Sequence, residues 1–528
     1  MRAPGIRRSP IPRLPRDAEA VETKFCAAGF HLVGWRGSMI RFGTSGWRAL
    51  ISEDFTFTNV RKIAAAIAVH VKENPDYGAS SPDYLQKRGG APPNPPEVAV
   101  GFDGRFLSPE MAQEVAGVLA AQGIRVLLSE TEIPTPAVAH AVTAKKLVGG
   151  LMITASHNPA RYNGVKWMPF WGGQAPQEVT GEIERRVDLS GEHAVKILGA
   201  DPALRRSWIE PFDFAGPYIK QLLSLLDVKA IKKARLKIAF DAMHGAARLV
   251  IEPLASALGI EAVVLRGARD VLFEGRPPEP SGGNLSELSD RVVRRRMDLG
   301  LATDGDADRF GVVDSDGHWM APDLVLGLVL DHLISRRGLS GKVARSIMTS
   351  HFVDAVARSH GLETRETPVG FKHIGELLRT GQYLLGGEES GGLSIAGHVP
   401  NKDGLLAALL VAEIAAHEGK PLKAVLAALF KRVGPFYQKR LSVPFDGLRE
   451  SEEVMESLRA KPPLEIAGAA VWRIDETDGF KFILKDGSWL GLRVSGTGAY
   501  FRLYAEAPDQ RRLESLVRCG KDLLKAKR

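Results

Sequence analysis

Alternation between short apolar runs and helix-length segments is the feature that most limits the fold of this chain. After residue 39, runs such as 98–102, 125–128 and 148–153 are separated by segments long enough for helices. Strands that alternate with helices at this spacing form mostly parallel sheets. The same alternation of strand-like runs and helix-length segments occurs twice more before residue 434. After residue 434 the sequence is instead rich in strand-like runs. We therefore predict three similar α/β domains with mixed sheets, plus a smaller C-terminal α+β domain, around a central cleft.

The expected domains span residues 39–200, 201–309, 310–434 and 435–528. A chain of 528 residues needs several domains, because single cores stop growing near about 250 residues. The first 38 residues are rich in Arg and Pro and lack periodicity. We expect them to be a disordered extension, or a mis-assigned start with Met39 as the real beginning. They do not resemble a secretory signal, because no apolar core follows the basic start.

Composition excludes several classes of protein. The 44% hydrophobic and 25% charged fractions are those of a globular protein, and no apolar run approaches the length of a membrane span. Two distant cysteines, Cys26 and Cys519, indicate a reducing compartment and exclude a thiolate zinc site. Half of the +8 charge lies in residues 1–38, which hold seven Lys/Arg and three acidic residues. We expect a cytoplasmic protein that binds neither membranes nor nucleic acid.

The loop Thr154-Ala155-Ser156-His157-Asn158-Pro159 follows the apolar run 148–153 directly. Pro159 cannot continue a strand and restricts Asn158, so the chain must break into a loop there. Ser156 is thereby placed at the end of a strand, where the active-site groups of α/β sheets collect. Just upstream, Thr135 is expected to cap a helix that begins at Pro136.

An acidic loop follows the apolar run 299–303. Asp304, Asp306 and Asp308 alternate along it, and alternate carboxylates on an extended loop can meet at one point, as Mg²⁺ requires. The spacing is not that of an EF-hand, which needs Gly and Glu where Arg309 and Ser315 stand. Three protein oxygens leave the octahedron of Mg²⁺ incomplete. We expect a phosphate oxygen to complete it, supplied by Ser156 if that residue is phosphorylated.

Two further loops carry polar groups between glycines. The loop 386–392 presents a carboxylate and a hydroxyl suited to the vicinal hydroxyls of a sugar, and His398 and Lys402 follow as candidate acids or bases. The loop 493–498 combines Arg493, Ser495 and Thr497 with glycines, which is typical of a phosphate nest.

These four loops, in this order and at these spacings, resemble the α-D-phosphohexomutase superfamily, and most closely its bacterial phosphoglucomutase/phosphomannomutase members. The similarity covers about Met39 to the C-terminus. It implies a reversible hexose 1-phosphate/6-phosphate mutase that works through a phosphoserine, Mg²⁺ and a bisphosphorylated sugar such as glucose 1,6-bisphosphate. It also implies a phosphorylated hexose as the partner, and we expect a monomer or a homodimer.

The resemblance assigns a role to each matching residue. The expected catalytic residues are Ser156, His157, Arg48, Lys166, His398 and Lys402. The expected metal ligands are Ser156, Asp304, Asp306 and Asp308. The expected substrate-binding residues are Arg309, Lys372, Glu389, Ser390, Arg493, Ser495, Gly496, Thr497 and Arg502.

The chain departs from the family pattern in two places. The C-terminal loop usually continues with Glu-Pro, where Gly498-Ala499 stands here, so phosphate affinity or loop closure can differ. Some members carry a His where this chain has Gly392, which moves the proton-transfer role to His398 or Lys402.

The loop 386–392, called the sugar loop below, resembles that of phosphoglucomutases, so we expect a preference for glucose. The alternatives are mannose or glucosamine specificity, or a sugar-bisphosphate synthase. A metal-dependent phosphatase would not need the Arg493 loop, and a catalytically silent scaffold would find support only in Gly498-Ala499.

Overall fold

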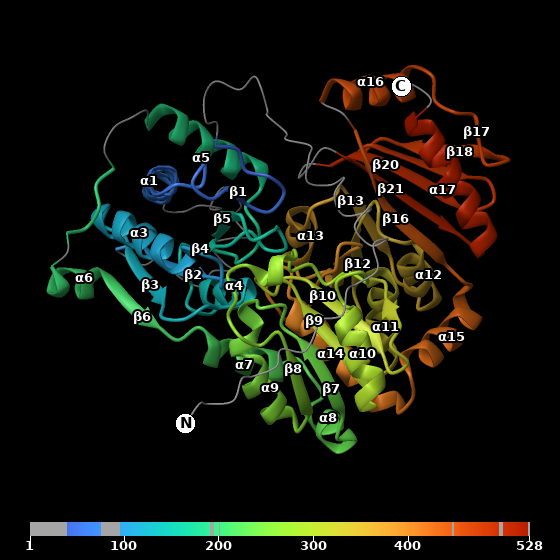
Figure 1. Cartoon of the computed structure of the whole chain (residues 1–528), viewed down its shortest axis with the longest axis horizontal. Helices are drawn as coiled ribbons and strands as arrows, with labels where there is room; N and C mark the ends of the chain where they lie inside the picture. The colour runs from blue at the N-terminus through green and yellow to red at the C-terminus, as the bar shows by residue number, and fades with distance from the viewer. Residues whose placement is uncertain are drawn as a thin grey trace, which may run out of the picture. The chain divides into compact units, whose positions relative to one another are not determined.

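The structure is a computed structural model that describes residues 40–74, 95–190, 195–199, 201–445, 448–495 and 500–525 (Figure 1). The expectation for residues 1–38 lies outside these ranges. Four sheets organise the described chain, one after another along the sequence. Within the described residues, no helix combines the length and apolarity needed to cross a membrane.

The first sheet has the strand order β1-β5-β4-β2-β3-β6 and is mixed, with parallel pairing of β2 to β3 and β4. Its strand β4 is buried on both faces. Leu151 and Ile153 join the core cluster beneath α1, α3 and α5, whereas Met152 joins the cluster that contains residues of α4. This period of two explains why the run 148–153 is apolar throughout. The elements are β1 (Trp47–Leu50), α1 (Phe57–Glu73), β2 (Glu97–Phe102), α3 (Ser108–Ala121), β3 (Arg125–Ser129), α4 (Thr135–Ala144), β4 (Gly149–Ile153), β5 (Tyr162–Pro169), α5 (Gln177–Ser190), α6 (Pro202–Trp208) and β6 (Ile209–Phe212).

The second sheet has the order β11-β10-β9-β7-β8, with β7 parallel to β8 and β9, and β10 antiparallel to β9. The acidic loop lies in the turn between β9 and β10. The elements are α7 (Ala215–Ser224), α8 (Val228–Ala234), β7 (Lys237–Asp241), η1 (Ala246–Leu249), α9 (Ile251–Leu258), β8 (Glu261–Leu265), η2 (Phe273–Gly275), α10 (Ser286–Arg295), β9 (Leu299–Thr303), β10 (Phe310–Asp314) and β11 (Trp319–Met320).

The third sheet has the order β13-β12-β14-β15, in which only the β14–β15 pair is antiparallel. The sugar loop connects these two strands. The elements are α11 (Pro322–Ser335), β12 (Lys342–Ser346), α12 (His351–Ser359), β13 (Thr364–Thr367), α13 (Phe371–Leu378), β14 (Tyr383–Glu388), β15 (Gly392–Ile395), α14 (Gly404–Glu418) and α15 (Leu422–Val433).

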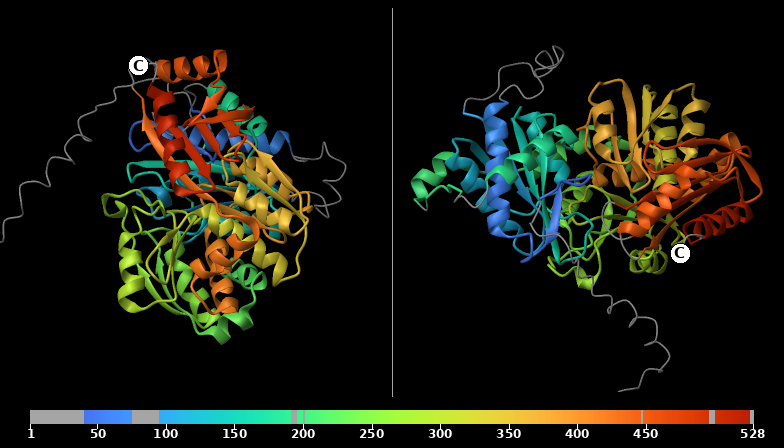
Figure 2. Two further views of the ribbon diagram at one scale, coloured as in Figure 1. Left: turned by 90° about the vertical axis from the view of Figure 1, so that its right-hand side faces the viewer. Right: turned by 90° about the horizontal axis from the view of Figure 1, so that it is seen from above.

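The fourth sheet is antiparallel throughout, in the order β16-β21-β20-β19-β18-β17. Helix α17 packs across one face of it, as both views in Figure 2 show. The elements are β16 (Tyr437–Pro444), α16 (Leu448–Ala460), β17 (Glu465–Ile466), β18 (Ala469–Asp475), β19 (Phe480–Leu484), β20 (Trp489–Val494), β21 (Tyr500–Ala507) and α17 (Gln510–Lys525).

Three mixed α/β sheets followed by a smaller antiparallel α+β unit confirm the expected fold class. The sheets divide the chain at positions that differ from the expected boundaries. Strand β6 lies beyond residue 200 but pairs with β3 of the first sheet, and β10 and β11 lie beyond residue 309 but complete the second sheet. Both differences arise because hydrogen-bonded pairing, and not local composition, decides which sheet a strand joins.

Candidate active site

The loop after β4 holds Ser156 in a fully buried position. Ser156 has a φ of 53°, an uncommon conformation for a residue other than glycine. Its backbone N–H donates to Thr154 Oγ1 over 2.8 Å, and its Oγ donates to Asp304 Oδ2 over 2.6 Å. The loop 154–159, the serine loop, follows a strand of the first sheet. The loop 304–309, the acidic loop, follows a strand of the second sheet, and the hydrogen bond to Asp304 brings the two loops into direct contact.

Arg105 shapes this loop, although the sequence analysis did not select it. Its buried guanidinium donates to four carbonyl oxygens at distances of 2.6–3.0 Å. Asp103 accepts from its Nε over 3.2 Å and compensates its charge. A planar fork with five donors is suited to such a task. The carbonyls belong to Ser156, Asn158, Pro159 and Tyr162.

Asp304, Asp306 and Asp308 are all buried, and one oxygen of each lies within 4.8 Å of the others. Burial, together with the neighbouring charges of Asp306 and Asp308, raises the pKa of Asp304 well above its usual value. Asp306 Oδ1 and Asp308 Oδ1 are buried without a hydrogen-bond partner in the described chain. Crowded carboxylates with free oxygens fit a hard divalent cation, which would supply the missing positive charge.

Thr135 takes part in this cluster and not in helix capping. Helix α4 begins at Thr135 itself, with Pro134 as its N-cap residue. The Thr135 hydroxyl donates to Asp306 Oδ2, so the expectation that Thr135 caps a helix from Pro136 is wrong. Tertiary contact with a loop 171 positions away overrides the local capping preference.

Two lysines contact the acidic loop, and both lie close to Asp308 Oδ2. Lys166 Nζ, on β5, donates to Asp306 over 2.5 Å and to Asp308 over 2.8 Å, and Lys402 Nζ lies 3.2 Å from Asp308. Burial lowers the pKa of Lys402, although Asp308 acts against this. Burial would also lower the pKa of Lys166, but Asp306 and Asp308 raise it overall. Of the two amines, Lys402 is the more ready to give up a proton.

Gly392 provides the room for Lys402. A Cβ at position 392 would lie 2.4 Å from Lys402 Cδ and 2.8 Å from its Cγ. The lysine stem thus occupies the space that a side chain at position 392 would need. A side chain at position 392 and the Lys402 stem cannot both occupy this space. This is a structural reason for glycine at position 392.

The two candidate histidines lie in different surroundings. His157 Nδ1 lies 3.4 Å from Ser156 Oγ, and burial together with Arg309 and Arg48 lowers the pKa of His157 well below its usual value. His398 instead lies 2.8 Å from Asp403, which also accepts from the Tyr218 hydroxyl. In the described chain His398 has no hydrogen bond or ion pair to Ser156 or to the three aspartates. The expectation of His398 as a proton carrier gains no support from these contacts.

Two expected arginines flank the serine and acidic loops. Arg48 on β1 donates to Asn158 Oδ1 over 2.8 Å, and burial followed by the charge of Arg309 lowers its pKa. Arg309 follows the acidic loop, and its backbone N–H donates to Asp304 Oδ1 over 3.1 Å. Its guanidinium lies 3.7 Å from Glu279.

The sugar loop points its two glutamates in different directions. Glu389 accepts from Ser346 over 2.6 Å and from the Tyr504 hydroxyl over 3.3 Å, so its carboxylate faces the fourth sheet. Glu388 accepts from the Gly370 N–H over 2.8 Å and from Ser390 Oγ over 3.5 Å. Burial raises the pKa of Glu388, and the charge of Lys402 opposes this.

Glu388, which the sequence analysis did not select, is therefore the glutamate of this loop that interacts with Lys402. Its position as the first Glu of Gly-Glu-x-Ser-Gly was the available signal. Lys372 lies in the first turn of α13, two residues after Gly370, whose N–H binds this carboxylate.

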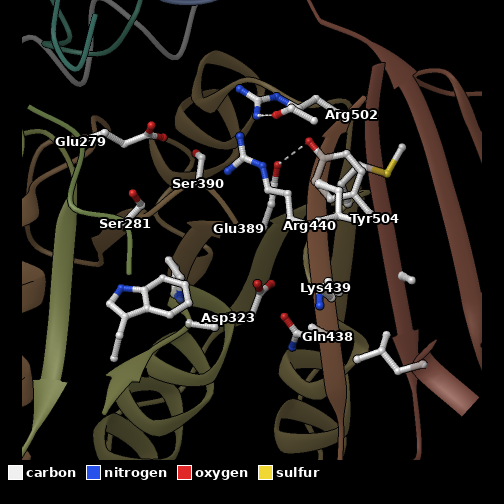
Figure 3. A pocket seen from close by; sticks show the side chains of 18 of the residues that line it. Glu279, Ser281, Asp323, Glu389, Ser390, Gln438, Lys439, Arg440, Arg502 and Tyr504 are labelled. Carbon is white, nitrogen blue, oxygen red and sulfur yellow. Dashed lines mark hydrogen bonds between the residues drawn. The ribbon is translucent and has the colours of Figure 1, made fainter. Parts of the chain in front are cut away.

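Three arginines of the C-terminal sheet surround the buried Tyr504 hydroxyl. Burial and then the charge of Glu389 raise the pKa of Tyr504 to about 12, and Arg440, Arg493 and Arg502 act in the opposite direction. Figure 3 shows Arg440 and Arg502 beside Tyr504 and Glu389 at one end of a cavity of about 570 Å³. Arg440 also helps to lower the pKa of His157, so this end of the cavity acts electrostatically on the serine loop.

The sequence analysis did not select Arg440, because the local sequence shows only a Lys-Arg pair in a strand and no binding motif. Of the expected C-terminal residues, Arg493 donates to Asp478 over 3.1 Å, and Arg502 donates to Ser442 over 2.6 Å. Gly496 and Thr497 lie outside the described residues, as does the departure at Gly498-Ala499.

Four domain families match the chain consecutively, and all four carry the description phosphoglucomutase/phosphomannomutase. Alpha/beta/alpha domain I matches residues 39–193, domain II residues 216–317, domain III residues 321–433, and the C-terminal domain residues 444–518.

Relatives over nearly the full length carry names of the same kind. A phosphoglucomutase/phosphomannomutase of Thermococcus kodakarensis is 31% identical over 92% of this chain and 98% of its own. A phosphoglucosamine/phosphogalactosamine mutase of Sulfurisphaera tokodaii is 28% identical over 92% and 99%. The crystal structure of a Thermus thermophilus protein, provisionally assigned as a phosphomannomutase, superposes with a TM-score of 0.77 at 31% identity and covers 92% of this chain and 99% of its own.

Proposed function

Because the chain belongs to the phosphoglucomutase/phosphomannomutase family of phosphohexomutases, we propose that it interconverts glucose 1-phosphate and glucose 6-phosphate through a phosphoserine at Ser156. The observation that supports this most directly is the 2.6 Å hydrogen bond from Ser156 Oγ to Asp304. It joins a buried hydroxyl to a buried carboxylate cluster, and phosphoryl transfer needs both at one point.

Asp304, Asp306 and Asp308 would hold the divalent cation, with Mg²⁺ as the ion that suits an all-oxygen site. Bound there beside a phosphate oxygen on Ser156, the cation would neutralise the charge that develops on the phosphoryl group. The chain itself positions the reacting oxygen, because Arg105 holds the carbonyls of Ser156 and Asn158 within the serine loop. Such positioning provides much of the rate enhancement in phosphoryl transfer.

Lys402 accepts the proton of the attacking sugar hydroxyl in this proposal. The bond between phosphorus and Ser156 Oγ breaks as the bond to the sugar oxygen forms, and the hydroxyl proton passes to the Lys402 amine. The pKa of this amine is lowered by burial, which suits a group that must exchange protons near neutral pH. Lys166 stays charged between two aspartates and stabilises the transferring phosphoryl group.

In both directions of the reaction, the end of the sugar that lies away from Ser156 carries a phosphate. Arg440, Arg493 and Arg502 lie around Tyr504 and offer the bidentate donors that suit a phosphate dianion. Glu388 and Ser390 would accept and donate hydrogen bonds to the sugar hydroxyls between the two ends. A bisphosphorylated sugar such as glucose 1,6-bisphosphate can then turn around between equivalent phosphate sites and return its other phosphate to Ser156.

Glucose is the proposed sugar because two adjacent glutamates occupy the sugar loop, a pattern that resembles phosphoglucomutases. The name of the Sulfurisphaera tokodaii relative includes glucosamine and galactosamine, so amino-sugar phosphates are the alternative substrates.

A coupled assay tests both the activity and the sugar. It compares glucose 1-phosphate, mannose 1-phosphate and glucosamine 1-phosphate in the presence of Mg²⁺ and a trace of glucose 1,6-bisphosphate. We expect glucose 1-phosphate to be the best substrate, and we expect its turnover to be lost in Ser156→Ala and retained in Ser335→Ala, which replaces an exposed serine. Full activity in Ser156→Ala would exclude Ser156 as the phosphoryl carrier. A preference for another sugar phosphate would refute the glucose assignment alone.

A further inference from the structure

A second cluster of metal-ligand side chains lies between helices, and none of the roles described above uses it. It consists of His332 on α11, Glu413 and His417 on α14, and Asp227, the N-cap residue of α8. One ligand atom from each of His332, Glu413 and His417 lies within 4.8 Å of the others. These helices belong to the second and third α/β units, so the cluster connects two parts of the chain.

The spacing within the cluster fits a small coordination sphere. His332 Nε2 lies 2.8 Å from Glu413 Oε1, and His417 Nε2 lies 3.2 Å from Asp227 Oδ2. Neighbouring ligands of a tetrahedral zinc site are about 3.3 Å apart, given bonds of about 2.0–2.1 Å. Glu413 and His417 are four positions apart on α14, a spacing that places both side chains on one helix face.

The surroundings of Glu413 resemble the support that carboxylate ligands usually have. Its Oε2 accepts from the Asp227 N–H over 2.7 Å, whereas Oε1 points to His332. Arg337 Nη1 lies 3.2 Å and 3.4 Å from the two oxygens and donates over a shorter 2.8 Å to the Leu225 carbonyl. The guanidinium therefore partly balances the charge of Glu413, and the ring centroids of His332 and His417 lie 5.3 Å apart.

We propose that His332, Glu413 and His417 bind one Zn²⁺ ion, with a water molecule as the fourth ligand and Asp227 beside His417. Two imidazoles and one carboxylate suit a borderline-soft cation better than Mg²⁺, which prefers oxygen alone. The Asp227 and His417 side chains retain 39% and 27% exposure, so the ion can enter from solvent. The ligands come from α11 and α14 and lie beside the N-cap of α8, so the bound ion stabilises the junction of these three helices.

Metal titration of the full chain tests this proposal independently of the sugar reaction. Protein stripped of metal is kept in excess Mg²⁺, which occupies the aspartate loop, and is titrated with Co²⁺ and then Zn²⁺. We expect one Co²⁺ per chain with the intense visible absorption of a tetrahedral site, displacement by one Zn²⁺, and a higher midpoint of thermal unfolding with Zn²⁺.

His417→Ala is the informative variant, because this half-buried side chain can be removed with little risk to folding. We expect it to weaken Zn²⁺ binding by about 100-fold and to remove the Co²⁺ band. His360→Ala is the matched control, since His360 pairs with Asp331 outside the cluster and should leave both readouts unchanged. The absence of a Co²⁺ band in the wild type, or an unchanged band in His417→Ala, would overturn the proposal. Zinc K-edge absorption gives a second readout, in which two nitrogen ligands are expected and an all-oxygen shell would refute the site.

Discussion

Replacing Gly305 by Ala tests whether contact between the serine and acidic loops sets the rate. A Cβ at position 305 would lie 2.6 Å from the Ser156 carbonyl oxygen, whereas ordinary contacts begin near 3.4 Å. Arg105 holds this oxygen over 2.6 Å, so it cannot retreat freely. The loops must therefore separate by roughly 0.8 Å, the difference between the two distances.

Such a separation would stretch the hydrogen bond between Ser156 Oγ and Asp304, now 2.6 Å, to the limit of hydrogen bonding. A misplacement of about 1 Å at a reacting group costs about 100-fold in rate, which corresponds to about 2.7 kcal/mol of activation free energy. We therefore expect kcat/KM for glucose 1-phosphate to fall by about two orders of magnitude in Gly305→Ala.

The coupled mutase assay at saturating Mg²⁺ measures this effect, and circular dichroism checks that the variant is folded. Gly283→Ala is the control, because a Cβ at that position meets no atom within 4 Å and should leave kcat/KM unchanged. A folded Gly305→Ala variant with the wild-type kcat/KM would show that the loop spacing does not limit the reaction.

Three further predictions concern other parts of the molecule. Gly392→His should lower kcat at least tenfold, because its Cβ would displace the Lys402 stem, 2.4 Å away, from Asp308; an unchanged pH–rate profile would contradict the role of Lys402. Arg105→Lys keeps the charge but loses the fork that binds four carbonyls, so we expect a loss of about 3 kcal/mol in urea unfolding; wild-type stability would argue against the clamp. Burial raises the pKa of Asp323 from 3.8 to about 7, so its stabilising contribution is complete below pH 3.8 and is lost as the pH rises through about 7. Asp323→Asn should therefore be more stable than the wild type at pH 8, by on the order of a few kcal/mol, and much less so at pH 4; equal thermal midpoints at both pH values would refute this account.

Sequence reasoning succeeded where the deciding contacts are local. The run 148–153 must be a strand buried on both faces, and Pro159 must end the loop that follows. Asp304, Asp306 and Asp308 lie within five residues of one loop, so their spacing in the sequence already brings their oxygens close together. The order of strands and helices was likewise readable, because the period of apolar residues differs between the two structures.

The same reasoning failed where side-chain direction or a distant partner decides. At the end of β14, Glu388 is the last residue of the strand and its carboxylate interacts with Lys402, whereas Glu389 lies in the turn that follows and contacts Tyr504. Thr135 caps no helix because Asp306, from another sheet, takes its hydroxyl.

The sequence alone thus determined the domain rhythm and the chemical content of each loop, since both depend on neighbours within a few residues. Only the tertiary structure decided that Arg105 holds the serine loop, that Lys402 and not His398 faces the aspartates, and that Arg440 lies with Arg493 and Arg502 near Tyr504. Each of these contacts joins residues far apart in the chain. Their partners are set by how the sheets pack, and no spacing within the sequence carries that information.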